Sequence, residues 1–191
     1  MNELILSIVN KAIELLQHFG FIAGFFLIAL ESIIPILPLG LFVAFNFSAY
    51  GMIPGFILSY ISTIIGCIVA YYLSKKLFGF YIEKKSSELV QFKKIINRLK
   101  NIDFSKLVLI MALPFTPAFL INIAAGTIKL NMRKFVASLF VAKISIVYFW
   151  GLVGKSFIDS IGDLRAITVI CISLAVSYML SKIVSKKLKL D

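Results

Sequence analysis

The chain has 191 residues, 60% of them hydrophobic, and a formal net charge of +11. Soluble domains are closer to half apolar, so this composition excludes an ordinary soluble domain and indicates an integral membrane protein. The positive charge does not predict a nucleic-acid partner, because the lysines concentrate in segments suited to cytoplasmic loops. The two cysteines, Cys67 and Cys171, lie in apolar sequence without disulfide or metal-ligand spacing.

The first fifty residues predict a surface helix followed by a broken apolar segment. Residues 2–19 have apolar side chains at helical spacing and polar ones opposite, which predicts an amphipathic helix along the membrane surface. Residues 21–50 are apolar but contain Pro35 and Pro38, which divide them into halves too short to cross a bilayer. They predict a re-entrant hairpin with these prolines at its tip; one kinked span is the alternative.

The middle of the chain predicts a transmembrane helix and then a basic segment. Residues 53–74 are continuously apolar, and residues 80–106 combine helical apolar spacing with lysines. The latter predicts a basic amphipathic helix on the cytoplasmic surface, with a solvated linker helix as the alternative. The span also has small residues three and four positions apart, which predicts close helix packing at Gly55, Ser59, Ser62, Gly66 and Ala70.

The second half repeats the interrupted pattern. Residues 107–126 contain Pro114 and Pro117 and predict a second re-entrant hairpin. Two more spans are expected at residues 135–154 and 166–184.

The distribution of basic residues predicts how these segments cross the membrane. If the second hairpin enters and leaves on the cytoplasmic side, the 80–106 segment, residues 127–134 and the tail at 185–191 all face the cytoplasm. The first hairpin then enters from outside. The expected fold class is a single-domain, all-α membrane bundle with two opposed re-entrant hairpins in inverted repeats and amphipathic surface helices.

Two ionisable residues within apolar sequence are the leading site candidates. Glu31 lies four residues before Pro35, and Lys143 lies in the middle of the 135–154 span. Charges at membrane depth are costly and mark functional sites by default. We hypothesise that both face one cavity, where Glu31 exchanges a proton and Lys143 pairs with it or binds a lipid phosphate. The alternatives are a Glu31 that hydrogen-bonds broken backbone and a Lys143 at shallower depth.

The remaining polar residues predict supporting roles. Asn46, Thr116 and Asn122 are expected to satisfy backbone groups freed at the hairpins, with headgroup contact as an alternative. Gly126 suits a close helix approach, and Trp150 is expected to be an interfacial anchor. No hydrolase motif, phosphate-binding glycine loop or metal-ligand cluster occurs, so no enzyme activity, cofactor or metal site is expected.

Two motifs resemble the DedA superfamily, in particular the branch with the VTT (SNARE-associated) domain: Glu31-Ser-x-x-Pro35-x-x-Pro38 with Gly51 after it, and Pro114-x-x-Pro117 with Asn122-x-x-Ala125-Gly126 after it. The resemblance covers about residues 20–161. It implies two hairpins that meet at the bilayer midplane. It also implies that lipids move between leaflets, with undecaprenyl phosphate or phospholipid as the substrate and with proton coupling in bacterial members.

The chain departs from the family pattern at two positions. Met111 and Pro117 stand where arginines, natural phosphate ligands, are usual, so Lys143 or Lys129 would have to replace them. We therefore expect a multi-pass lipid transporter of the bacterial cell membrane, with anionic headgroups as further partners of its basic segments. The alternatives are a non-transporting scaffold and a small-solute channel.

Overall fold

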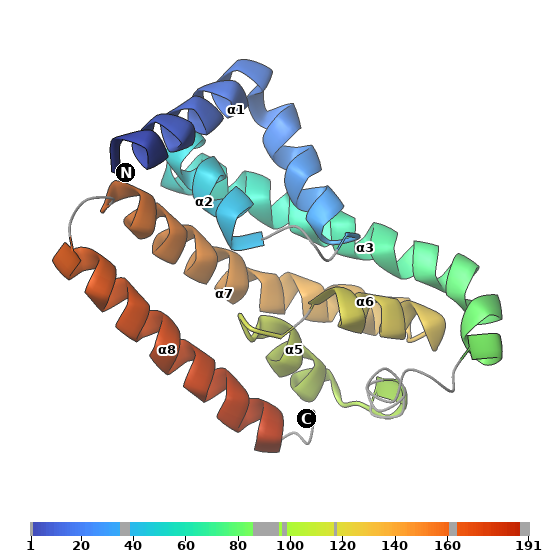
Figure 1. Cartoon of the computed structure of the whole chain (residues 1–191). Coiled ribbons are helices and arrows are strands. Elements are labelled where there is room, and N and C mark those ends of the chain that lie inside the picture. The colour runs from blue at the N-terminus through green and yellow to red at the C-terminus, as the bar shows by residue number, and fades with distance from the viewer. Residues whose placement is uncertain are drawn as a thin grey trace.

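The computed structural model describes residues 2–34, 39–85, 96, 99–116, 118–160 and 164–187. Every regular element in those residues is a helix (Figure 1). The helices are α1 (Asn2–Glu31), α2 (Leu39–Tyr50), α3 (Met52–Lys85), α5 (Phe104–Ala112), α6 (Ala118–Thr127), α7 (Met132–Asp159) and α8 (Leu164–Lys187).

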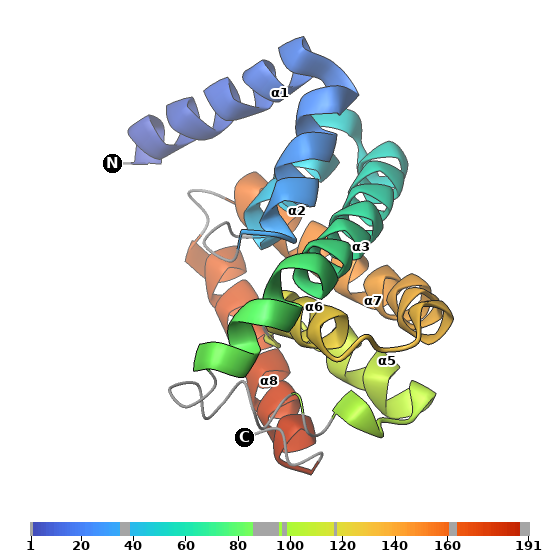
Figure 2. The ribbon, with the colours of Figure 1, turned by 90° about the vertical axis from the view of Figure 1, so that its right-hand side faces the viewer.

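A sharp break at Gly20 divides α1 into two helices. Gly20 has φ 69° and ψ −168°, a conformation that strains residues with a side chain. The break is held to the end of α2, because the Tyr50 hydroxyl donates to the Gly20 carbonyl at 2.8 Å. Figure 2 shows the first helix projecting away from the bundle. The break lies where the sequence divides residues 2–19 from residues 21–50, and the orientation of the first helix along a membrane stays a prediction.

Both proline-containing stretches separate two short helices, as the sequence predicts. α1 ends at Glu31 and α2 begins at Leu39, and the two helices pack together. Pro35, Pro38 and Pro117 lie outside the described residues. In the second stretch α5 ends before Leu113, whose extended backbone (φ −73°, ψ 124°) is the conformation expected of a residue that precedes a proline.

Among the described residues, two helical stretches are long and apolar enough to cross a membrane: Met52–Lys76 within α3, and Met132–Asp159. The apolar part of α8, Ile170–Val184, is shorter than these two. The span predicted at residues 53–74 agrees closely with Met52–Lys76, and α3 continues beyond this span through Lys85. Lysine is a good helix former and a single glycine costs only about 1 kcal/mol, so Gly79 did not end the helix.

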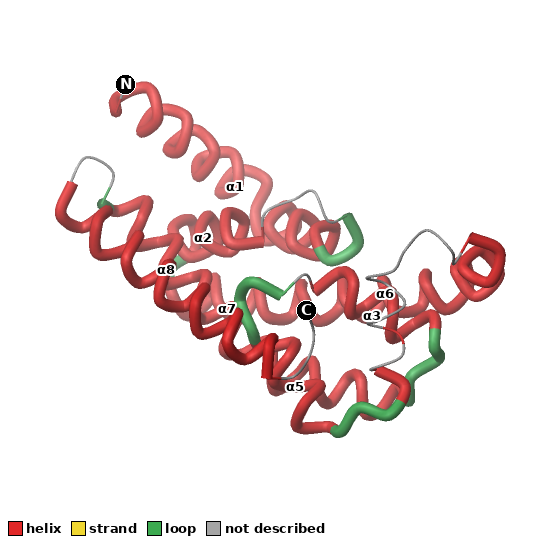
Figure 3. The backbone as a smooth tube through the Cα atoms, turned by 60° about the horizontal axis from the view of Figure 1, so that its bottom comes forward, coloured by secondary structure: helices red, strands yellow, loops and turns green. Residues whose placement is uncertain are grey.

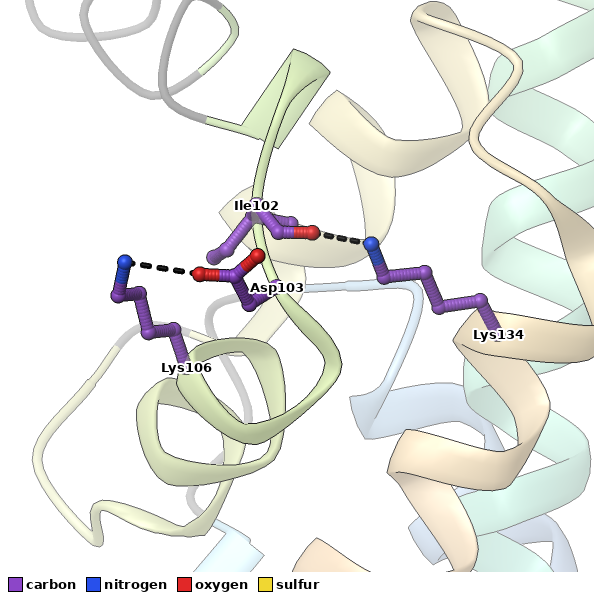
Figure 4. A network of polar contacts seen from close by, with 4 residues as sticks. All are labelled: Ile102, Asp103, Lys106 and Lys134. Atoms are coloured by element: carbon purple, nitrogen blue, oxygen red, sulfur yellow. Dashed lines mark hydrogen bonds and ion pairs between the residues drawn. The ribbon is translucent and has the colours of Figure 1, made fainter.

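The basic segment predicted at residues 80–106 is described only at its two ends. Its first residues belong to α3, and residues 86–95, 97 and 98 lie outside the described part. Leu99 and Ile102 are buried. Figure 4 shows the contacts at the C-terminal end of this basic segment. The Lys134 ammonium donates to the Ile102 carbonyl, and Lys106 pairs with Asp103 at 2.8 Å.

The helices of the two halves pack in a reciprocal pattern. α1 packs on α3 as α5 packs on α7, and α2 packs on α7 as α6 packs on α3. Small residues allow the closest approaches: a Cβ at Gly66 would lie 2.5 Å from the Ala29 carbonyl oxygen, and one at Gly126 would lie 2.3 Å from that of Tyr71. The predicted small-residue face of α3 is confirmed, because all five of its residues are buried.

Two apolar clusters hold the bundle together. The larger one joins α5, α6, the second half of α3 and the first half of α7, and it includes Tyr71, Leu107 and Leu139. The smaller one joins α1, α2 and the middle of α7, and it includes Phe47 and Val147. α8 runs alongside α7 at the edge of the bundle (Figure 3).

Candidate functional site

A cavity of about 500 Å³ lies where the two broken stretches approach the second half of α7. α8 closes one side of it, so five helices and one turn contribute to its wall. The lining residues are Glu31 from α1, Leu39, Gly40, Leu41 and Ala44 from α2, Pro114 and Thr116 from the turn, Phe119 from α6, Ile146, Trp150, Val153, Gly154, Phe157 and Ile158 from α7, and Ile170 and Leu174 from α8.

The cavity wall is mainly apolar and carries a few polar groups. Glu31 is half-buried at the end of α1. The Thr116 hydroxyl oxygen is buried and has no hydrogen-bond partner among the described residues. A buried polar group without a partner costs about 1–3 kcal/mol, which a ligand with a polar group would recover. An apolar pocket with few polar groups is typical of a site for an amphipathic ligand.

Trp150 forms one wall of this cavity. Its indole packs on α2, where a Cβ at Gly40 would lie 2.6 Å from the ring. The indole also meets the Phe115 ring edge-on at 5.8 Å, and Phe115 in turn meets Tyr178 of α8 at 5.5 Å. Trp150 therefore lines the cavity, and its predicted role as an interfacial anchor stays a prediction. A helical count from Lys143 places Trp150 seven residues on, on the same face, and this could have indicated an inward position.

Lys143 is buried in α7, with an exposed fraction of 2%. It is not among the residues that line the cavity, although Ile146 and Trp150 on the same face of α7 are. It is close enough to Glu31 for the two charges to interact. Within the described residues, however, ion pairs within 4.0 Å join only Lys106 to Asp103 and Lys155 to Asp159. The structure thus brings the two candidates near each other but puts only Glu31 on the wall.

The two hairpin asparagines serve helix packing. Asn46 donates from Nδ2 to the Ser59 hydroxyl at 3.1 Å, and Asn122 donates from Nδ2 to the Cys67 sulfur at 3.2 Å. Both partners are side chains of α3, so the expectation that these asparagines satisfy freed backbone groups is wrong. The reason is that α3 offers polar side chains on the face to which both α2 and α6 pack.

These observations define a class: a helical membrane protein in which two interrupted apolar stretches flank two long apolar helices beside an amphiphilic cavity. The family model of the VTT domain matches residues 34–156. The chain therefore belongs to the VTT domain family of DedA-type membrane proteins. The matched region begins three residues after Glu31 and includes Lys143. The family is linked to membrane transport.

One relative among curated proteins extends the comparison. The chain is 27% identical over 143 residues to the uncharacterized membrane protein YhjE of Bacillus subtilis (strain 168). This match covers 72% of the present chain and 67% of the relative. No solved structure matches the chain. Within the described residues, no group of three His, Cys, Asp or Glu side chains could hold a metal ion.

Proposed function

We propose that this chain is a multi-pass protein of the bacterial cell membrane that moves a phosphate-bearing lipid between leaflets. The candidate substrates are undecaprenyl phosphate and phospholipids. The cavity beside Glu31 is the observation that carries the proposal, because its apolar wall and few polar groups suit a lipid headgroup in transit. Membership of the VTT domain family supports a role in membrane transport.

The architecture that we propose for transport consists of two re-entrant hairpins related by an inverted repeat. The reciprocal packing of α1 on α3 with α5 on α7, and of α2 on α7 with α6 on α3, supports this relation. Helices as short as α2, α5 and α6 do not span a bilayer of about 30 Å. Transporters commonly put their sites where such broken helices from two repeats meet.

The charges suggest how a phosphate could enter and leave. An ionised Glu31 repels a phosphate at the cavity wall, whereas a protonated Glu31 can donate a hydrogen bond to it. Uptake of a proton would therefore admit the headgroup, and loss of the proton would expel it. Lys143 behind the wall would attract the phosphate without contacting it, and the unpartnered Thr116 hydroxyl would be a direct ligand.

The test is lipid movement in liposomes that contain labelled undecaprenyl phosphate or labelled phospholipid. We expect wild-type protein to exceed empty vesicles, and Glu31→Gln to slow movement about tenfold or more, equivalent to about 1.4 kcal/mol in the barrier. Glu14→Gln is the matched control, because Glu14 is exposed on the first part of α1. Wild-type protein no faster than empty vesicles, or Glu31→Gln as fast as wild type, would refute the proposal.

Whether water-soluble reagents reach the cavity distinguishes a transporter from a non-transporting scaffold. The experiment uses a Cys171→Ser background, because Cys171 is exposed and would react with the reagent. Cys67 is buried, so a thiol introduced at position 31 is the one that the reagent can modify. A water-filled site predicts that an impermeant thiol reagent modifies Glu31→Cys. A thiol that such a reagent does not reach from either side of the membrane would favour the scaffold.

A further inference from the structure

A second hollow lies at the end of the α3 span, against the connection between α6 and α7. Its volume is about 370 Å³ and it shares no lining residue with the Glu31 cavity. Three of its lining side chains are cationic, and none of the described lining residues carries a carboxylate. The lining residues are Tyr71, Lys75, Lys129, Leu130, Asn131, Met132 and Arg133.

Lys129 occupies a backbone position that normally belongs to glycine. The Leu130 amide donates to the Ala125 carbonyl at 2.9 Å, and the Lys129 amide donates to the Gly126 carbonyl at 3.0 Å. This is the Schellman pattern that ends a helix with a left-handed residue, usually glycine. Lys129 has φ 53° and is the one non-glycine residue with positive φ in the described part of the chain. A lysine in this conformation is less favourable than glycine.

The connection that carries Lys129 is held in place. The Tyr71 hydroxyl donates to the Leu130 carbonyl at 2.6 Å and ties the connection to α3. The Asn131 side chain accepts from the Arg133 and Lys134 amides, so these two amides in the first turn of α7 are already occupied. An anion in this hollow would therefore be bound mainly by the cationic side chains.

The position of the hollow favours a lipid over a soluble anion. Lys75 lies one residue before the end of the apolar stretch Met52–Lys76. The neighbouring side chains of Tyr72 and Leu73 are exposed on the same helix, with exposed fractions of 51% and 41%. Cationic groups next to exposed apolar side chains at the end of a span match the boundary between headgroups and acyl chains.

We propose that Lys75, Lys129 and Arg133 form a binding site for the phosphate of an anionic phospholipid headgroup, separate from the Glu31 cavity. The phosphate oxygens accept charge-assisted hydrogen bonds from the three cations, while the acyl chains lie against the exposed side of α3. The site needs no lipid movement, so its test is independent of the transport proposal.

The test measures binding of short-chain phosphatidylglycerol to the detergent-solubilised chain. The readout is the shift that the lipid causes in the thermal unfolding midpoint. We expect Lys129→Gly to unfold at the same or a higher temperature than wild type without lipid, because glycine suits the left-handed position. We expect the same variant to bind the lipid about tenfold more weakly, as for loss of one charge-assisted hydrogen bond. Lys129→Gln, which keeps the backbone unfavourable but removes the charge, should weaken binding equally.

Two controls make the outcome decisive. Lys182→Gln removes an exposed lysine from α8 outside the hollow and should leave binding unchanged. Inorganic phosphate and short-chain phosphatidylcholine at the same concentration should cause no comparable shift. The proposal fails if Lys129→Gly binds phosphatidylglycerol as wild type does, or if Lys182→Gln weakens binding as much. It also fails if inorganic phosphate matches the lipid, because the hollow would then bind free phosphate.

Discussion

The two halves of α7 lie in contrasting surroundings. In its first half Phe135, Leu139 and Ala142 are buried in the larger apolar cluster, and the Phe135 ring stacks on Tyr71 at 4.9 Å. In its second half Trp150 and Gly154 face a cavity of about 500 Å³. One continuous helix therefore connects a densely packed end of the bundle to a hollow one.

We interpret the packed end as the part that stabilises the fold and the hollow end as the candidate site. Between helices in lipid, association depends on close packing, because lipid tails are as apolar as leucine. The packed end supplies those contacts through Gly126, which lets α6 approach α3. At the hollow end, the half-buried Glu31 and the unpartnered Thr116 hydroxyl lie on the cavity wall. The comparison predicts that substitutions at the packed end affect stability, and that those at the hollow end affect transport.

The largest effect is expected from Gly126→Val. A Cβ at Gly126 would lie 2.3 Å from the Tyr71 carbonyl oxygen and 2.8 Å from the Ser74 Cβ, and a backbone oxygen cannot rotate away. We expect destabilisation above about 3 kcal/mol, the upper end of ordinary overpacking, measured by unfolding in mixed detergent micelles. Ala137→Val on the exposed side of α7 is the control. Equal stability of the two variants would show that α6 and α3 do not pack this closely.

A smaller effect is expected when one side chain is truncated at the packed end of the bundle and another at the hollow end. Leu139→Ala removes a fully buried side chain, and we expect it to cost about 2–3 kcal/mol through lost packing. Leu174→Ala enlarges an existing cavity at the edge of the bundle and should cost less than about 1 kcal/mol. The same unfolding measurement applies to both. A reversed order of the two losses would contradict the division into a packed end and a hollow end.

The smallest effect is a pH dependence at Asp103. The hydrogen bond and charge of Lys106 hold the pKa of this carboxyl below its usual value of 3.8. The unfolded chain therefore binds more protons near pH 4, so this contribution is present above that pH and is lost as the pH falls through the lower, folded pKa. Thermal unfolding from pH 6 to pH 3 should show a slightly larger loss for wild type than for Asp103→Asn. The effect is small because the pair is exposed. An identical pH profile would show that the pair contributes nothing.

The helix breaks were predictable because their causes are local. Proline removes an amide donor and glycine permits a left-handed backbone, so the interruptions before Leu39 and at Gly20 follow from the residues themselves. The burial of the small-residue face of α3 followed from spacing alone. The continuation of α3 to Lys85 did not follow, because lysines signal a membrane boundary without ending a helix.

The site was only partly predictable, because its wall joins residues that are distant in sequence. Glu31 stood out as an acid in apolar sequence, and the structure puts it on the cavity wall. Leu174 gave no such signal, because the sequence pattern is the same for an apolar side chain that faces a cavity and for one that faces lipid. Lys143 stood out for its charge, but whether it lies on the wall or behind it depends on the rotation of α7.

The most direct test of the central claim is to fill the cavity without disturbing the packed end. Leu174→Trp adds bulk at the cavity wall, and Leu180→Trp adds the same bulk on the same helix at a side chain with an exposed fraction of 58%. In the liposome assay we expect Leu174→Trp to fall to the rate of empty vesicles while its unfolding midpoint stays at the wild-type value, and Leu180→Trp to transport as wild type does. Leu174→Trp that folds and still moves lipid at the wild-type rate would contradict the assignment of this cavity to transport.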